Sequence, residues 1–291
     1  EATHPLTTRS PMPYASEQDP ADWWQAVLRV LADLLAPLSA SDRQDIAAIG
    51  LSGQMHGAVL LDATDQVLRP TMLWNDGRAH AECADLARSL PQIGQIAGVP
   101  PLPGFTAPKL LWLSRHAPQD HARIAHVLLP KDYIGLRLHG GHVTDPSDAA
   151  GTLWFDQAAR RWSDALCAAS ATDPRWLPEL RAGHEVAGPL LPQVAEALGL
   201  RPGLPVVTGG GDAATGAVSV GAVEPGAELW NFLPMEMGCS PLLPGGKSWP
   251  MGGIHPPVIP KAVGVDRAVQ SDWKGAVYRL PVPSRRRGAM D

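Results

Sequence analysis

A glycine-rich turn between an apolar run and a run of small residues constrains this sequence most. Val206 and Val207 precede three glycines at 209–211, and Asp212 follows directly. The β-branched run predicts a short buried strand, and the small residues after Asp212 predict a tightly packed helix reaching about Val223. Because glycine permits sharp turns and close approach of a ligand, this pattern favours an α/β protein with a ligand at this strand end.

Asp212 allows two interpretations. As an N-cap, its carboxylate would accept free N–H groups of the first helical turn. As a base, it would take a proton from a substrate hydroxyl group. The two roles are compatible because a carboxylate has two oxygens. In either role, the helix dipole predicts that the acid stays ionised.

The glycine turn departs from the common phosphate-binding motifs. Gly211 and Gly216 have the spacing of a P-loop, but Ala217 and Val218 stand where that motif needs lysine and serine or threonine. Ala214 occupies the place of the third glycine in the dinucleotide-binding motif. The sequence therefore assigns no cofactor-binding residue to this turn.

Hydrophobic spacing along the rest of the chain predicts alternating helices and strands. Asp19 and Pro20 begin a helix that runs to about Ala36. Further helices are predicted over 80–90, 106–115, 131–138, 163–170 and 192–199. Strands are predicted over 46–51, 58–61, 73–74 and 127–129, with a loop at 39–45 and turns at 62–65 and 145–148. This alternation indicates α/β architecture.

Composition limits the partners and the compartment. The net charge of −5 gives no case for binding nucleic acid or an anionic membrane. No stretch approaches the roughly 18 apolar residues of a membrane helix. The three cysteines lie far apart, so they suit neither a disulfide framework nor a metal knuckle. We therefore expect a cytoplasmic protein that binds neither nucleic acid nor membrane.

The composition changes near residue 227. Residues 227–291 contain nine prolines and eight glycines, with eight basic and five acidic side chains. This density of proline and glycine predicts an irregular or disordered tail. The basic cluster at 285–287 is interpreted as solvated tail charge, with an anion-binding patch as the alternative.

A loop after one predicted strand carries side chains suited to a polyhydroxyl ligand. Gln54, Met55 and His56 lie between two glycines. The amide of Gln54 and the imidazole of His56 can each donate and accept hydrogen bonds, which matches sugar hydroxyl groups. The alternative is a histidine that only holds the turn together.

A second loop combines an aromatic face with charge. Asp76 and Arg78 follow Trp74 at another predicted strand end. An aromatic ring beside an acid and a guanidinium is a common way to hold a sugar. Alternatively, Asp76 or Asn75 caps the helix that follows.

Two histidines raise the question of a metal. His139 and His142 flank two glycines, and this spacing could hold a metal ion. No further ligand motif supports that interpretation, so a turn is favoured and no metal site is assigned.

Together, these loops resemble the xylulose kinase branch of the FGGY carbohydrate-kinase family. The sequence from Gln54 to His56 is similar to that branch rather than to the glycerol or gluconate kinases. The matching segments are 52–57, 68–70, 73–78, 103–112, 127–133, 145–151 and 209–212.

The resemblance implies a ribonuclease-H-like α/β fold of the actin and hexokinase type, with a mixed sheet and flanking helices. It implies ATP-dependent phosphorylation of D-xylulose at its 5-hydroxyl group, with Mg²⁺. Asp212 matches the catalytic base, and Met55 and His56 match the sugar contacts. Gln54, Asp76 and Arg78 complete the predicted sugar-binding residues. The expected partners are the sugar and a second copy of the chain.

The sequence also departs from the family. The family's opening strand hairpin, with its Asp-x-Gly-Thr turn, has no counterpart here, and Ala213 stands where the family has asparagine. After residue 226, neither the family's Gly-Thr-Ser phosphate loop nor its nucleotide lobe follows. We therefore predict an incomplete sugar-binding lobe over 1–226, lacking its first strands, and a non-family tail over 227–291, as in a truncated or frame-shifted product.

Several functional alternatives stay open. The chain alone is expected to turn over poorly or not at all, because the ATP lobe is missing. The alternatives are a non-catalytic sugar-binding fragment, a kinase for another sugar or polyol of the family, and a fragment that does not fold stably.

Overall fold

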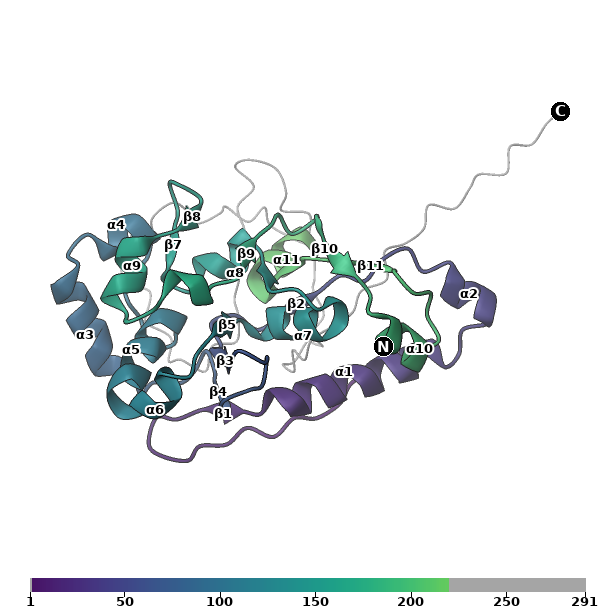
Figure 1. Ribbon diagram of the computed structural model, residues 1–291, viewed down its shortest axis with the longest axis horizontal. Helices are drawn as coiled ribbons and strands as arrows, with labels where there is room; N and C mark the ends of the chain where they lie inside the picture. The colour runs from purple at the N-terminus through teal and green to yellow at the C-terminus, as the bar shows by residue number, and fades with distance from the viewer. Residues whose placement is uncertain (1, 220–291) are drawn as a thin grey trace, which may run out of the picture.

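The computed structural model describes residues 2–219, where helices and short strands alternate along the chain (Figure 1). This arrangement confirms the predicted α/β class. The helices are α1 (Pro20–Leu35), α2 (Ala40–Gln44), α3 (His80–Ser89), α4 (Ile93–Ala97), α5 (Thr106–His116), α6 (Pro118–His121), α7 (Pro130–His139), α8 (Pro146–Ala150), α9 (Asp164–Ala169), α10 (Pro192–Leu198) and α11 (Asp212–Ser219), with a 3₁₀ turn at Pro174–Trp176.

The strands are two to four residues long. They are β1 (Glu17–Gln18), β2 (Ser52–Gly53), β3 (Val59–Leu61), β4 (Thr71–Met72), β5 (His126–Leu128), β6 (Val143–Thr144), β7 (Phe155–Asp156), β8 (Arg161–Trp162), β9 (Glu179–Leu180), β10 (Val186–Pro189), β11 (Pro205–Val207) and β12 (Gly210–Gly211).

Among the described residues, the predicted mixed sheet is divided into six two-stranded pairings. Isolated bridges join several of them: Ala58 pairs with Met72, which links β3 to β4, and Ile49 pairs in parallel with Val206 of β11. β3 runs antiparallel to β5, whereas β2 runs parallel to β12. Both parallel and antiparallel pairing therefore occur, as the sequence analysis expected.

The longest helix follows its sequence signals closely. The side chain of Asp19 accepts a hydrogen bond from the Ala21 N–H at 2.9 Å, and Pro20 is the first helical residue. Trp23, Trp24 and the aliphatic residues at helical spacing are buried on one face. This face packs on α7 and α10, which fixes α1 against the body of the molecule.

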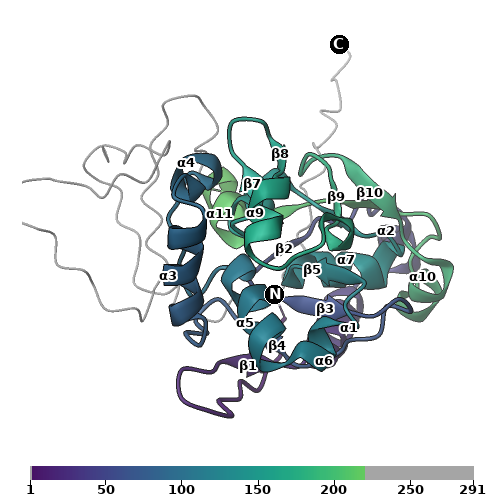
Figure 2. The ribbon, with the colours of Figure 1, turned by 60° about the vertical axis from the view of Figure 1, so that its left-hand side comes forward.

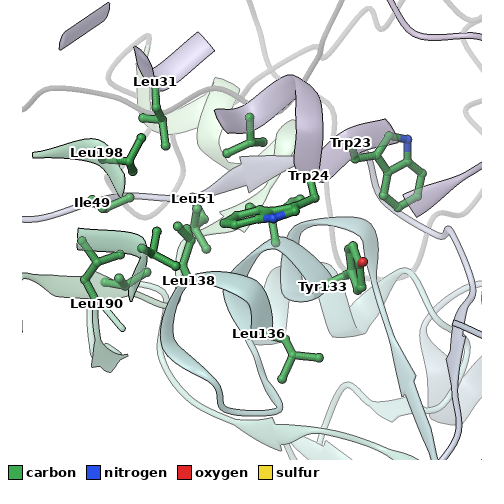
Figure 3. Packing of buried hydrophobic residues seen from close by; sticks show 14 of the residues in the cluster. Trp23, Trp24, Leu31, Ile49, Leu51, Tyr133, Leu136, Leu138, Leu190 and Leu198 are labelled. Carbon is green, nitrogen blue, oxygen red and sulfur yellow. The ribbon is translucent and has the colours of Figure 1, made fainter. Parts of the chain in front are cut away.

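Two hydrophobic clusters form the core. The first gathers side chains of α1, α7, α10 and β11, and Figure 3 shows Trp24 among leucines that include Leu51 and Leu138. The second is built mainly from α3, α4, α5 and α9, around the buried Trp154. In both ribbon views α3 and α4 lie at the opposite end from α2 and α10, with β2 between (Figures 1 and 2).

Most predicted helices and strands are present within a residue or two, but the strand predicted over 46–51 and two loop predictions are wrong. In 46–51, Ile49 makes an isolated bridge to Val206, and the strand β2 begins at Ser52. Segment 39–45 contains α2, because Ser39 and Asp42 form a reciprocal capping box. Segment 145–148 begins α8, because Asp145 caps the helix and Pro146 is its first residue. This Asp-Pro signal is the one that correctly predicted α1.

Some predictions lie outside the described residues. They are the end of the predicted helix at Val223, the domain boundary at 226 and the tail over 227–291. Within residues 2–219, no helix combines the length and hydropathy needed to cross a membrane.

Candidate functional site

One parallel strand pair brings the predicted sugar loop beside Asp212. In the register of β2 and β12, Gly53 lies opposite Gly211. Gln54 and Asp212 each follow directly, so both leave neighbouring strands at the same edge. The Ser52 hydroxyl also lies 2.6 Å from the Thr215 hydroxyl, which ties β2 to α11. Segments 158 residues apart in sequence therefore share one edge.

The glycines between β11 and α11 are required by close packing. Gly209 has a φ of +78°, and a Cβ atom there would collide with the carbonyl oxygen of Leu51. At Gly211, a Cβ atom would lie 2.8 Å from Met55 Cγ. Met55 therefore fills the space between the sugar loop and the Asp212 turn. At both positions a side chain would collide with neighbouring protein atoms, so the turn requires glycine.

His56 is held in one orientation. Its backbone has a φ of +67°, its Nδ1 lies 2.7 Å from the carbonyl oxygen of Gly151, and its ring centroid lies 4.9 Å from that of Phe105. Burial, assisted by the charge of Lys109, lowers the pKa of His56 to about 4. The neutral ring must donate through Nδ1 to the carbonyl, which leaves Nε2 as an acceptor.

Lys109 of α5 is fully buried and fastens this loop. Its Nζ donates to the carbonyl oxygens of His56 at 2.8 Å and Gly104 at 2.7 Å. Burial lowers the pKa of Lys109 to about 7, and the charge of Arg78 adds to this while Asp76 opposes it. The sequence analysis assigned Lys109 no role.

Asp76 and Arg78 pair with each other. Arg78 Nη2 lies 2.7 Å from Asp76 Oδ2 and 2.6 Å from Glu17 Oε1, and its guanidinium stacks 4.9 Å from the ring of Trp112. Asp76 Oδ2 also accepts the N–H of Ser16 at 2.9 Å. The pair therefore joins β1 to the loop after β4. The alternative that Asp76 caps α3 is wrong, since the N-cap residue is Ala79.

Asp212 is the first residue of α11. Its Oδ1 accepts the N–H of Ala213 at 2.8 Å. Burial raises the pKa of Asp212 above its ordinary value, and the backbone N–H groups only partly offset this. Burial therefore acts against the helix dipole at Asp212, and the ionised state of the acid stays a prediction. A carboxylate with raised proton affinity is a better proton acceptor than a solvated one.

A second buried lysine lies behind the Asp212 turn, at the start of α7. Lys131 Nζ is 2.5 Å from Asp132 Oδ1, 3.3 Å from Asp145 Oδ1 and 3.7 Å from Asp148 Oδ2. All four side chains are buried. Burial and the neighbouring acids, Asp212 among them, raise the pKa of Asp148 well above its ordinary value.

This charged cluster contacts the glycine turn directly. Lys131 Nζ reaches the carbonyl oxygen of Thr208 at 3.4 Å, and the Gly211 N–H donates to the Ser147 hydroxyl at 3.3 Å. Asp145 binds that hydroxyl in turn. The backbone before Asp212 is therefore fixed by α7 and α8. The sequence analysis missed this support because it took 145–148 as a simple turn.

His139 and His142 have different partners. His139 Nδ1 accepts the N–H of Gly141 at 3.1 Å, a local turn contact. His142 Nε2 lies 2.7 Å from Asp65 Oδ1 instead. The two histidines flanking the glycines are therefore engaged separately.

Comparison with known proteins places this site in a family. The N-terminal domain of the FGGY family of carbohydrate kinases matches residues 1–219. The chain is 51% identical over 222 residues to xylulose kinase of Escherichia coli K12, covering 76% of this chain and 45% of that protein.

Solved structures agree. The crystal structure of a "xyloylose kinase" from Brucella ovis matches with a TM-score of 0.73 and 46% identity, covering 76% of this chain and 45% of that one. Xylulose kinase from Rhodospirillum rubrum matches with a TM-score of 0.73 and 32% identity, covering 77% and 46%. The chain thus spans somewhat less than half the length of these relatives.

Proposed function

Because the chain belongs to the FGGY family of carbohydrate kinases, we propose that it supplies the sugar side of an ATP-dependent kinase that phosphorylates D-xylulose at its 5-hydroxyl group. The observation that carries the proposal is the parallel pairing of β2 with β12. It sets the loop of Gln54, Met55 and His56 beside Asp212 at one sheet edge. We further propose that the fold is ribonuclease-H-like, of the actin and hexokinase type.

In this proposal, His56 and Gln54 hold the sugar. Since Nδ1 of His56 is engaged by Gly151, Nε2 accepts a hydrogen bond from one sugar hydroxyl. The amide of Gln54 binds a second hydroxyl, and Met55 forms an apolar wall. Sugar binding by Asp76 and Arg78 stays a prediction, and their contacts with Glu17 and Trp112 give them a local structural role as well.

Asp212 is the proposed base. Its Oδ1 is engaged by the Ala213 N–H, so Oδ2 is the atom proposed to receive the proton of the 5-hydroxyl group as that oxygen bonds to the γ-phosphorus of ATP and displaces ADP. Phosphoryl transfer needs mainly alignment of the attacking oxygen and stabilisation of charge. The Lys131 cluster supports alignment, since it fixes the backbone immediately before Asp212.

The donor in this proposal is ATP with Mg²⁺, whose charge would offset that of the phosphates. Among the described residues, the glycine turn does not fit donor phosphates, because the N–H groups of Gly209, Gly210 and Gly211 already donate to other protein atoms. The proposal therefore assigns no donor contact to this turn. We also propose a cytoplasmic location, where the free thiols of Cys83 and Cys167 would stay reduced, and retain the homodimer as a prediction.

Calorimetry with D-xylulose tests the sugar side. We expect the wild-type chain to bind D-xylulose. His56→Ala should weaken binding by about tenfold or more, because one buried hydrogen bond is lost. His184 is exposed, so the control His184→Ala should bind like wild type. Stronger binding of gluconate or glycerol would favour the alternative of a kinase for another sugar or polyol. No heat with any of the three would contradict the proposal.

A coupled assay with ATP and D-xylulose tests the chemistry. Wherever turnover is detectable, Asp212→Asn should lower it by about 10²–10⁴-fold, the usual contribution of a general base, with D-xylulose binding preserved. Binding without turnover is the result already expected of the sugar side on its own, so it would not separate the kinase proposal from the alternative of a non-catalytic sugar-binding fragment.

A further inference from the structure

A second cluster of ligand-type side chains lies outside the sugar site. Asp65, His126 and His142 place one carboxylate oxygen and two imidazole nitrogens within 4.8 Å of one another. Within residues 2–219, this is the one group of at least three histidine, cysteine or acidic side chains that meets that distance. None of the three takes part in the proposed sugar chemistry.

The fold positions each member separately. Leu61 of β3 pairs with His126 of β5 and also bridges to Val67, so the turn that carries Asp65 returns beside His126. Asp62 braces this turn, since its carboxylate accepts N–H groups of Thr64 and Gln66.

His142 is positioned from another direction. It directly precedes β6, and its carbonyl oxygen accepts the N–H of Glu179 at 3.0 Å beside the pairing of β6 with β9. Three separate backbone segments therefore place Asp65, His126 and His142 at the same point of the surface.

The side chains lie near the spacing of metal ligands, and a bound ion would replace the Asp65–His142 hydrogen bond and turn the two stacked rings so that their nitrogens converge. His142 Nε2 lies 2.7 Å from Asp65 Oδ1, and the rings of His126 and His142 stack 4.0 Å apart with an interplanar angle of 17°. Tetrahedral zinc with bonds of about 2.0–2.1 Å separates its ligand atoms by about 3.3 Å. The side chains of Asp65 and His142 are 41% and 28% exposed, so an ion and a bound water can reach them.

We propose that Asp65, His126 and His142 form a surface binding site for a zinc-type divalent transition-metal ion. Two imidazoles with one carboxylate are ligands that zinc, cobalt and nickel prefer, whereas Mg²⁺ prefers oxygen ligands throughout. The site is therefore distinct in chemistry from the magnesium proposed to accompany ATP. A bound ion would join the turn after β3 to β5 and to the segment before β6.

The competing explanation is a plain hydrogen bond between Asp65 and His142 that joins two surface segments. That explanation needs no contribution from His126. The role of His126 therefore separates the two: a metal needs its nitrogen, whereas the hydrogen bond survives its removal.

Calorimetric titration of the chelator-treated full chain with ZnCl₂ tests the site. We expect binding of one ion, and a loss of affinity of at least tenfold in both His126→Ala and His142→Ala. The exposed-site control His184→Ala should bind like wild type. MgCl₂ should give no heat that depends on His126.

Two further readouts complete the test. CoCl₂ should give the visible absorption of a tetrahedral site in wild type but not in His126→Ala, and Zn²⁺ should raise the Tm of wild type more than that of His126→Ala. Neither readout depends on kinase activity. The proposal is overturned if wild type binds no Zn²⁺, or if His126→Ala binds it as tightly as wild type.

Discussion

Two buried lysines support opposite sides of the candidate site, and their environments are opposite. Lys109 lies among backbone carbonyls beneath His56, and burial lowers its pKa to about 7. Lys131 lies among three carboxylates behind the Asp212 turn, and those carboxylates outweigh burial and raise its pKa. Both side chains are almost completely removed from water, so burial alone does not decide the charge.

The difference teaches what each lysine does. A neutral amine has two N–H groups, which match the two carbonyl acceptors of Lys109. Lys109 can therefore hold the His56 loop by hydrogen bonds without a buried charge. Lys131 must stay charged, since three acids surround it and a buried charge is tolerated only when paired. The sugar loop is thus held by hydrogen bonds, and the Asp212 turn by an ion cluster.

Removing the charge of Lys131 should have the largest effect. Lys131→Met leaves three buried acids without their cation, and we expect a loss of about 3–5 kcal/mol in the free energy of unfolding. Urea denaturation at pH 7 measures it. Lys131→Arg keeps the charge and should lose less. If Lys131→Met were no more destabilising than Lys109→Met, the contrast between the two lysines would be wrong.

The same contrast shows what the sequence can predict. Capping, periodicity and glycine patterns predicted α1, α5 and the turn before Asp212, because those signals are local. The proximity of Gln54 to Asp212 could be predicted only from the family resemblance, since it depends on a strand pairing across 158 residues.

The supporting lysines escaped sequence analysis for a physical reason. A lysine is normally exposed, and nothing within a few residues reveals that Lys131 faces Asp145 and Asp148 from another helix. Equally, the local spacing of His139 and His142 does not reveal which side chains His142 contacts. The partners of His142 come from Asp65 and His126, which lie on two other segments.

Removing Lys109 should lower the free energy of unfolding by less than removing Lys131, and it should change how that free energy depends on pH. Lys109→Met leaves the Gly104 carbonyl without this donor, whereas the His56 carbonyl still accepts from Thr106, so we expect a loss of about 1–3 kcal/mol at pH 7. Because the folded pKa of Lys109 is about 7 and lies below its unfolded value of 10.5, the unfolded chain binds the extra proton between these values.

The free energy of unfolding of wild type should therefore rise with pH over this window relative to Lys109→Met. The slope contributed by one proton is at most about 1.4 kcal/mol per pH unit. Urea melts of both proteins from pH 7 to pH 10 measure the difference. Parallel pH profiles for wild type and variant would show that Lys109 is charged in the folded state and that the comparison fails.

The smallest expected effect is a change in the pKa of His56 when Lys109 is replaced. It tests the comparison of the two lysines most sharply, because His139 is a control in the same NMR spectrum. The pKa of His56 and the pKa of His139 are each lowered to about 4, mainly by burial. Lys109 contributes to the shift at His56, whereas Arg181 and Lys131 contribute at His139. In Lys109→Met, an NMR titration of the histidine ring protons should show a higher pKa for His56 that still lies below 6.5, because burial persists. His139 should titrate as in wild type. If the pKa values of His56 and His139 rose equally, the variant would have a generally loosened fold. If the pKa of His56 did not change, Lys109 would already be neutral at the pH where His56 titrates.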